Sequence, residues 1–192
     1  MSPIYESQVF KIGQDRIRAS MYRTAEDVLS KGLTASAAEG FDVFLSHSIK
    51  DASVVLGVVD LLESEGITVY VDWLVGPHLN RSDVSRQTAN QLRERMRSCR
   101  SLIFATSASS PASKWMPWEL GYFDGFKGER VAILPLVDDS GSARGQEYLD
   151  LYPQVEVVSV GSTRRLGATR GTFHREGLTL ADWLRGKRFQ PM

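Results

Sequence analysis

Short runs dominated by apolar residues recur along the chain from residue 41 onward. A run of about six such residues, bounded by polar or turn-forming ones, is typical of a strand buried on both faces of a sheet. Five runs fit this pattern: 41–46 (FDVFLS), 67–72 (ITVYVD), 101–107 (SLIFATS), 131–137 (VAILPLV) and 155–160 (VEVVSV). We therefore expect five strands in this part of the chain.

Segments with helical periodicity separate the predicted strands. In residues 52–65, apolar side chains return every three or four positions, Asp51 can cap the first turn, and Gly66 is placed to end the helix. The same reasoning predicts three further helices, within residues 83–98, from residue 118 onward, and within residues 178–184 (LTLADWL).

Strands that alternate with helices at this spacing imply right-handed crossovers and a parallel sheet covered on both faces. The predicted fold is therefore α/β, a flavodoxin-like doubly wound sheet of five parallel strands in the order 2-1-3-4-5. We expect residues 41–186 to form this domain and residues 187–192 to form a short tail.

Residues 1–40 precede the alternation and are expected to form a helical extension and a linker. Lys31-Gly32 supplies a basic last turn and a stop, and TASAAEG (34–40) is typical of a flexible link. The apolar positions at helical spacing are Ile17, Met21, Ala25 and Val28. The extension can pack on the main domain or serve a partner, and the sequence leaves both possibilities open.

The composition of the chain excludes several kinds of partner and site. Lys plus Arg equals Asp plus Glu at 23 each, so the total charge gives no reason to expect nucleic acid or a membrane as partner. Cys99 is the only cysteine, which excludes an internal disulfide and a cysteine-based zinc site, and His78 and His174 lack metal-ligand spacing. No secretory signal or membrane-spanning stretch is recognisable, so we expect a cytoplasmic protein without a metal.

Residues 113–125 (SKWMPWELGYFDG) gather aromatic side chains around one glutamate where a strand gives way to a helix. Glu119 stands among Trp115, Trp118 and Tyr122. Aromatic surface beside a single carboxylate suits a flat, cationic, sugar-bearing ligand that stacks on the rings. Alternatively, the tryptophans pack in the core and Glu119 is a favourable first-turn residue. This segment alone does not decide between the two interpretations.

Topology favours the ligand-binding interpretation. In a doubly wound sheet, ligands bind beyond the carboxyl ends of the strands where the strand order reverses, which here is between the first and third strands. The loops that follow the first three strands should therefore surround one crevice. They carry Ser46, His47, Asp72, Trp73, Ser107, Trp115 and Glu119.

The motifs FDVFLSHS, VYVD, SLIFATS and SKWMPWELG together resemble a Toll/interleukin-1 receptor (TIR) domain over roughly residues 41–185. The chain is most similar to small stand-alone bacterial TIR proteins of the Thoeris anti-phage type. In enzymatic TIR domains, the glutamate of a W-x-x-x-E pattern is required for cleaving NAD between ribose and nicotinamide. The resemblance therefore implies a catalytic Glu119 and substrate contacts from Trp115, with Trp118 where a tyrosine often stands.

One carboxylate is enough for this cleavage. The reaction passes through an oxocarbenium-like state, but nicotinamide already carries positive charge and leaves as a neutral base, so no acid must protonate it. Water as acceptor gives ADP-ribose, whereas an atom of the same nucleotide gives a cyclic product, which a pocket shielded from water favours.

The resemblance implies an NAD nucleosidase or ADP-ribosyl cyclase that takes NAD as substrate, needs no cofactor, and makes a cyclic ADP-ribose-type signal in anti-phage defence. It also implies a homo-oligomer held by TIR–TIR contacts, a downstream effector that senses the product, and a phage-derived trigger. Two alternatives stay open: a non-enzymatic TIR interaction module, and a nucleoside deoxyribosyltransferase, which uses a similar sheet and a glutamate. A hydrolytic triad of Ser46, His47 and Asp51 is disfavoured because residues so close in sequence rarely meet in that geometry.

Overall fold

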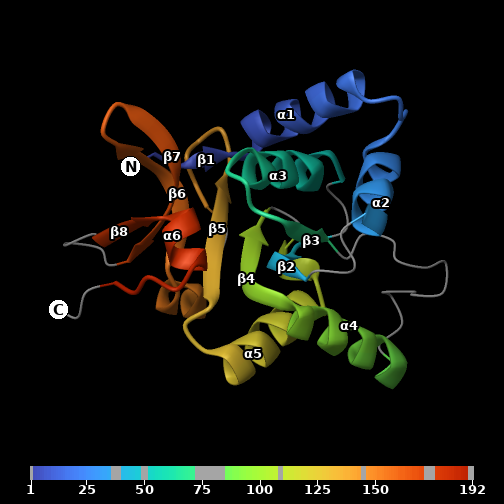
Figure 1. The fold of residues 1–192 in the computed structure, drawn as a ribbon, viewed down its shortest axis with the longest axis vertical. Helices are drawn as coiled ribbons and strands as arrows, with labels where there is room; N and C mark the ends of the chain where they lie inside the picture. The colour runs from blue at the N-terminus through green and yellow to red at the C-terminus, as the bar shows by residue number, and fades with distance from the viewer. Residues whose placement is uncertain are drawn as a thin grey trace.

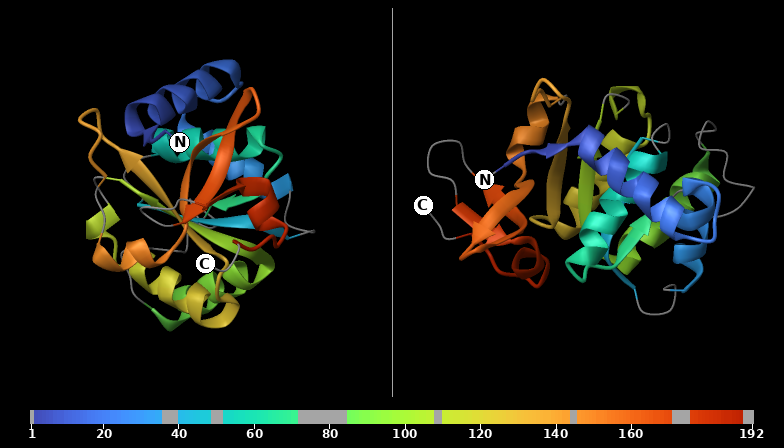
Figure 2. Two further views of the ribbon diagram at one scale, coloured as in Figure 1. Left: turned by 90° about the vertical axis from the view of Figure 1, so that its left-hand side faces the viewer. Right: turned by 90° about the horizontal axis from the view of Figure 1, so that it is seen from above.

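A central sheet runs through the protein with helices on both of its faces (Figures 1 and 2). The computed structural model describes residues 2–35, 40–48, 52–71, 85–107, 110–143, 146–170 and 176–189. The strands are β1 (Ile4–Tyr5), β2 (Phe41–Ser46), β3 (Val69–Val71), β4 (Cys99–Thr106), β5 (Val131–Val137), β6 (Gln154–Val160), β7 (Thr163–Arg170) and β8 (Glu176–Thr179). The α-helices are α1 (Glu6–Ala19), α2 (Ala25–Ala35), α3 (Ala52–Ser64), α4 (Arg86–Ser98), α5 (Met116–Lys127) and α6 (Leu180–Leu184), and the 3₁₀ helices are η1 (Ser110–Ala112) and η2 (Glu147–Leu151).

The five predicted strands form the parallel part of the sheet. They lie in the order β3-β2-β4-β5-β6, which is the expected order 2-1-3-4-5, and every neighbouring pair in this set is parallel. The α/β class and the doubly wound arrangement are confirmed. The predicted total of five strands is wrong, because the described residues form eight.

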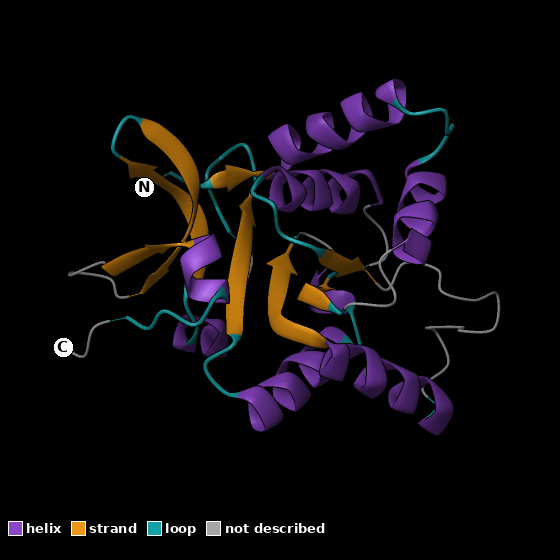
Figure 3. Ribbon diagram, viewed as in Figure 1, coloured by secondary structure: helices purple, strands orange, loops and turns teal. Residues whose placement is uncertain are grey.

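The additional strands lie beyond and beside the parallel set (Figure 3). β7 and β8 continue the sheet past β6 in antiparallel pairs, and β1 pairs with the end of β5. β7 lacks a continuous apolar run, since only its second half is buried. Its signal was instead the turn Gly161-Ser162 between the paired residues Val160 and Thr163, where Gly161 adopts a φ of 61°.

Two helical predictions need correction. The closing helix expected within residues 178–184 is shorter, because β8 extends to Thr179, whose hydroxyl then caps α6 by accepting a hydrogen bond from Asp182 N at 3.1 Å. The single helix expected around residues 17–31 is two helices, α1 and α2. Met21 lies between them and is 97% exposed, so its helical spacing was coincidental.

Alternation along the strands divides the core into two layers. On β2 and β4, Val43, Leu45 and Ile103 face α1, α2 and α3, whereas Phe44 and Leu102 face α4 and α5. The two helical layers appear above and below the sheet in Figure 1. The same alternation determines which polar residues at the strand ends lie on the α4 and α5 side of the sheet.

The N-terminal helix α1 packs directly on α3. A Cβ atom at Gly13 would lie 2.0 Å from Ser53 O, and one at Gly57 would lie 1.9 Å from Val9 O, so both glycines are required for the two backbones to approach this closely. Arg16 adds ion pairs to two residues of α3, with N–O distances of 3.1 Å to Asp60 and 2.7 Å to Glu63. Among the described residues, no helix is both long and apolar enough to cross a membrane.

Candidate active site

Glu119 is a fully buried carboxylate at the carboxyl end of the parallel sheet. Its side chain has no exposed surface, and Ser46 Oγ donates a hydrogen bond of 2.6 Å to Glu119 Oε2. Ser46 is the last residue of β2 and is itself fully buried. The pair therefore lies where the strand order reverses, between β2 and β4, which is the position at which the sequence analysis expected a binding crevice.

Local sequence explains why Glu119 lies there. Ser113 Oγ accepts a hydrogen bond from Met116 N at 3.2 Å, so it satisfies one of the free amides that begin α5. Pro117 stands in the first turn, where a missing N–H costs nothing. Glu119 N bonds to Trp115 O at 2.8 Å, which places the carboxylate in that first turn, where the helix dipole favours negative charge.

Strand alternation separates the polar residues at the strand ends into two groups. Ser46 on β2 faces α5, and Thr106 on β4 has the same parity as Phe104, which also packs on the α5 side. His47 and Ser107, one residue further along each strand, instead line a small cavity on the α3 side together with Leu45, Val54 and Val58. The structure thus brings Ser46 to Glu119 but places His47 and Ser107 across the sheet from it.

Thr106 is a residue that the sequence analysis did not select. Its side chain is 2% exposed, and Oγ1 has no hydrogen-bond partner among the described residues. A buried hydroxyl without a partner costs stability, about 1–3 kcal/mol, and so is uncommon unless something else binds it. The signal that could have revealed it is parity, since Thr106 shares the face of Ser46 and Ser107 does not.

Hydrogen bonds join Ser107 and Ser110 in the segment between β4 and α5. Ser110 Oγ accepts a hydrogen bond from Ser107 N at 2.7 Å and donates one to Ala105 O at 3.3 Å. His47 is 3% exposed, and its Nδ1 lies 3.0 Å from Ser48 O. His47 and Ser107 thus lie on the α3 side of the sheet, and their contact with substrate stays a prediction.

The aromatic residues of α5 form a ladder. Trp115 is 6% exposed and meets Trp118 edge-on with ring centroids 5.4 Å apart, and Trp118 stacks on Tyr122 at 5.6 Å. The guanidinium of Arg93 on α4 lies 5.2 Å from the Trp118 centroid and 5.7 Å from that of Tyr122. Trp115 lies one turn before Glu119, whose N–H bonds to Trp115 O, whereas Trp118 and Tyr122 face α4.

Several predicted residues lie outside the described part of the chain: Asp51, Asp72, Trp73, His78 and His174. Within the described residues, no group of three or more His, Cys, Asp or Glu side chains could hold a metal ion. The second buried carboxylate, Glu156, accepts a hydrogen bond of 3.3 Å from Thr169 on the neighbouring strand β7. Among the residues that the structure describes at this end of the sheet, the buried carboxylate is that of Glu119.

This arrangement can act on a substrate that develops positive charge. A buried carboxylate interacts with charge more strongly than an exposed one, because little water screens it. The Ser46 hydroxyl fixes one of its oxygens, which limits the reorganisation that a reaction would require. Such a group can accept hydrogen bonds from sugar hydroxyls and oppose a cationic carbon.

Comparisons with known proteins agree with the geometry. Residues 43–159 match the TIR domain family. A protein of Bacillus cereus (strain MSX-D12), named probable 3' cyclic ADP-D-ribose synthase ThsB', is 49% identical over 142 residues, which cover 70% of this chain and 73% of that protein. A protein of Cytobacillus dafuensis named as a candidate cyclic ADP-D-ribose synthase, TIR2, is 34% identical over 83 residues, which cover 43% of this chain and 22% of that protein.

Proposed function

The chain belongs to the TIR domain family, and from this premise we propose that it cleaves NAD between nicotinamide and ribose and forms a cyclic ADP-ribose. The observation that carries the proposal is the buried hydrogen bond between Ser46 and Glu119 at the carboxyl ends of the strands. The names of both relatives, each described as a cyclic ADP-D-ribose synthase, support the cyclic product.

Glu119 is the catalytic residue of this proposal. As the bond from ribose C1′ to the nicotinamide nitrogen breaks, its electron pair leaves with nicotinamide, which becomes neutral, and positive charge develops on the ribose. Glu119 accepts hydrogen bonds from the ribose hydroxyls and stabilises the charge on the sugar. No proton is needed by the leaving group, so a site with one carboxylate is sufficient.

Ser46 and Thr106 support the carboxylate from the neighbouring strands. Ser46 is a positioning residue, because its contact with substrate chemistry runs through Glu119 Oε2. Thr106 offers a buried hydroxyl on the same face of the sheet, and we assign it to a polar group of the bound nucleotide. Trp115 lies one turn before Glu119, and we assign its ring to the wall of the substrate site.

The acceptor decides the product. A buried site excludes water from the cationic sugar, so an atom of the same ADP-ribose forms the new bond to C1′. The fully buried Glu119 and Ser46 are consistent with such a site. Hydrolysis to ADP-ribose is then the minor reaction.

The proposal includes a cellular setting. Copies of the chain associate through TIR–TIR contacts, a phage-derived component triggers them in the cytoplasm, and a downstream effector senses the cyclic product. Residues 41–186 act as the TIR domain, and the helical residues before them pack on α3 through Gly13 and Gly57. Asp72 and Trp73 belong to the substrate-binding set together with Trp118 and Tyr122.

Mass spectrometry of the nucleotides formed from NAD tests the reaction. Purified protein is incubated with NAD, with and without an extract of phage-infected cells, and the products are separated. A cyclic ADP-ribose and nicotinamide in equal amounts are expected. Base exchange on deoxynucleosides without any action on NAD would instead favour a deoxyribosyltransferase.

A further inference from the structure

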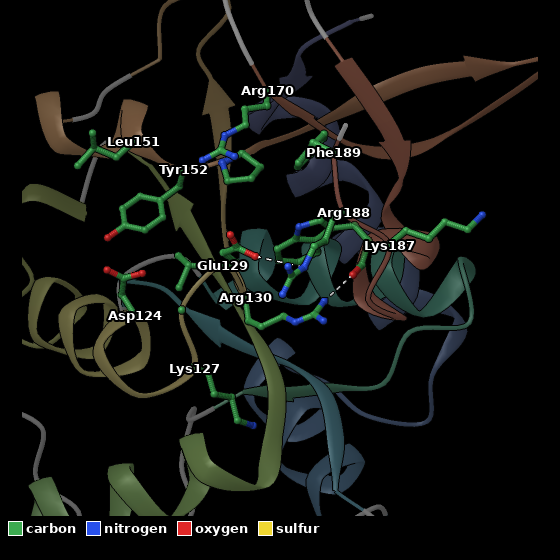
Figure 4. Close-up of a pocket in the computed structure, with 14 residues that line it drawn as sticks. Asp124, Lys127, Glu129, Arg130, Leu151, Tyr152, Arg170, Lys187, Arg188 and Phe189 are labelled. Atoms are coloured by element: carbon green, nitrogen blue, oxygen red, sulfur yellow. Dashed lines mark hydrogen bonds and ion pairs between the residues drawn. The ribbon is translucent and has the colours of Figure 1, made fainter. Parts of the chain in front are cut away.

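A hollow lies at the end of the parallel strands opposite to the end near Glu119, and Figure 4 shows the side chains that line it. It has a volume of about 590 Å³, which falls in the range of small-molecule sites. Its floor is formed where β5 and β6 begin, at Val131 and Pro153, and where the antiparallel β7 ends, at Arg170. Glu119 and Ser46 stand at the carboxyl ends of the parallel strands, so the two sites are distinct.

Positive charge is concentrated in this hollow. Two carboxylates line it, Asp124 and Glu129, together with five cationic side chains: Lys127, Arg130, Arg170, Lys187 and Arg188. The charges of the whole chain balance at 23 of each sign, so the local excess is not a consequence of composition. A partly enclosed cationic surface attracts multivalent anions.

One of the arginines is held firmly in place. Arg130 Nη1 donates a hydrogen bond of 2.9 Å to Trp183 O at the end of α6. Gly186 has a φ of 103°, and a Cβ atom there would lie 3.1 Å from Arg130 Nη2. Glycine at this position therefore permits the positive φ of the turn and leaves room for the Arg130 guanidinium. The guanidinium is thus held in place before any ligand binds.

Other cations of the hollow remain available to a ligand. Arg170 is exposed, and among the side chains that the structure describes, which do not include that of Glu176, none forms an ion pair or hydrogen bond with its guanidinium. Arg188 pairs with Glu129 at 3.5 Å, but these side chains are 83% and 73% exposed, so the pair is weak and can be exchanged for a phosphate. Figure 4 shows Arg170 and Arg188 directed into the hollow from different elements.

Rings and apolar side chains form the remaining wall. Tyr152 and Phe189 are half-buried and line the hollow with Leu151, Pro153 and the buried Trp183. The Tyr152 hydroxyl is directed toward Asp124 (Figure 4), and burial together with this carboxylate raises the pKa of Tyr152. Tyr152 is thus a neutral ring at physiological pH, suited to stacking on a nucleobase.

We propose that this hollow binds a nucleoside di- or triphosphate, with Arg170 and Arg188 on the phosphates and the base against Tyr152 and Phe189. Arginine suits this task because its planar fork binds phosphate oxygens in pairs. The cavity volume accommodates a mononucleotide. Binding here does not depend on whether Glu119 cleaves NAD.

Isothermal titration calorimetry with ATP and ADP tests the proposal, using the full chain that carries Glu119→Gln so that no turnover contributes heat. Binding should weaken about tenfold in Arg170→Ala and in Arg188→Ala, corresponding to one lost phosphate contact. The matched control is Arg164→Ala, since Arg164 is an exposed arginine on the same strand β7, and it should bind as tightly as the parent.

Pyrophosphate and adenosine test the phosphate contacts and the base contacts separately. Pyrophosphate should bind and respond to Arg170→Ala, whereas adenosine should bind far more weakly than ADP. Unchanged ATP affinity in both Arg170→Ala and Arg188→Ala would overturn the proposal, because the nucleotide would then occupy another place. The absence of measurable binding up to millimolar ATP would overturn it as well.

Discussion

Ser46 Oγ and Glu119 Oε2 are joined by a hydrogen bond of 2.6 Å although the two residues are 73 positions apart in the chain. The bond links the end of β2 to the first turn of α5, on the face that β2 and β4 share. A hydrogen bond between side chains contributes about 0.5–1.5 kcal/mol to stability. It therefore both fixes the carboxylate and ties α5 to the sheet.

Replacing Ser46 by alanine should affect turnover more than binding. In Ser46→Ala, Glu119 keeps its place in α5 but loses the group that orients Oε2. We expect kcat for NAD cleavage to fall about 10–100-fold with KM changed less than about threefold. Steady-state kinetics measures both constants. A rise in KM with unchanged kcat would contradict the positioning role and indicate a direct contact with substrate.

Thr106→Val should raise the stability of the fold and lower its NAD-cleaving activity. Valine has the shape of threonine without the hydroxyl, so removing an unpartnered buried Oγ1 should stabilise the fold by up to about 1 kcal/mol. If the hydroxyl binds the nucleotide, NAD cleavage falls about tenfold in the same variant. Thermal unfolding and nicotinamide release are measured together.

Thr88→Val is the control for that pair of measurements. Thr88 Oγ1 lies 2.9 Å from Ser85 Oγ in the first turn of α4, so its hydroxyl is already engaged. This variant should lose stability and keep its activity. Unchanged NAD cleavage in Thr106→Val would show that Oγ1 does not contact the substrate.

Gly57→Ala should disturb the docking of α1. The added Cβ would meet Val9 O at 1.9 Å, so α1 must shift, at a cost of about 1–3 kcal/mol. Gly125→Ala in α5 is the control, because nothing lies within 4 Å of the position and alanine favours helix. Urea unfolding should show opposite signs for the two variants, and equal effects would contradict the close approach of α1 to α3.

Cys99 should be unreactive in the folded protein. Burial raises the pKa of its thiol from 9.0 to about 12, so at pH 8 the thiolate is roughly a thousandfold rarer than in the unfolded chain. Alkylation at pH 8 should be slow in buffer and fast in denaturant. Equal rates would contradict the burial.

The raised pKa of Cys99 also makes the stability of the fold depend on pH in the alkaline range. Above about pH 9 the unfolded chain releases the thiol proton and the folded one retains it until about pH 12. The contribution of the buried Cys99 to stability is therefore complete below pH 9 and is lost as pH rises toward 12. Cys99→Ala should remove this part of the alkaline decline.

Much of the fold could be predicted because its signals are local and strong. Continuous apolar runs revealed the five parallel strands, and Gly66 ended α3 as expected with a φ of 75°. β7 and β8 were missed because a half-exposed antiparallel strand carries no such run. The close contact of α1 with α3 at Gly13 and Gly57 could not be predicted, because a single glycine within a helix does not show which helix packs against it.

The candidate site was predictable down to the strand ends and no further. Topology placed Ser46 near Glu119, but the sequence analysis did not use the fact that adjacent residues face opposite sides of a sheet, and so it did not select Thr106. Trp118 and Tyr122 follow Trp115 in the same segment, and their contact with Arg93 on α4 was not predicted. Which of two helical faces packs against a partner helix depends on tertiary contacts that periodicity does not specify.

The central claim, that Glu119 drives the cleavage of NAD, is tested most directly by nicotinamide release from the wild-type protein and from Glu119→Gln. Glutamine keeps the size of the side chain and an oxygen for the Ser46 hydroxyl, so thermal unfolding should confirm a folded variant. With an extract of phage-infected cells present in both reactions, we predict that Glu119→Gln releases nicotinamide at least about a hundredfold more slowly. Equal rates of release from the two folded proteins would contradict the account.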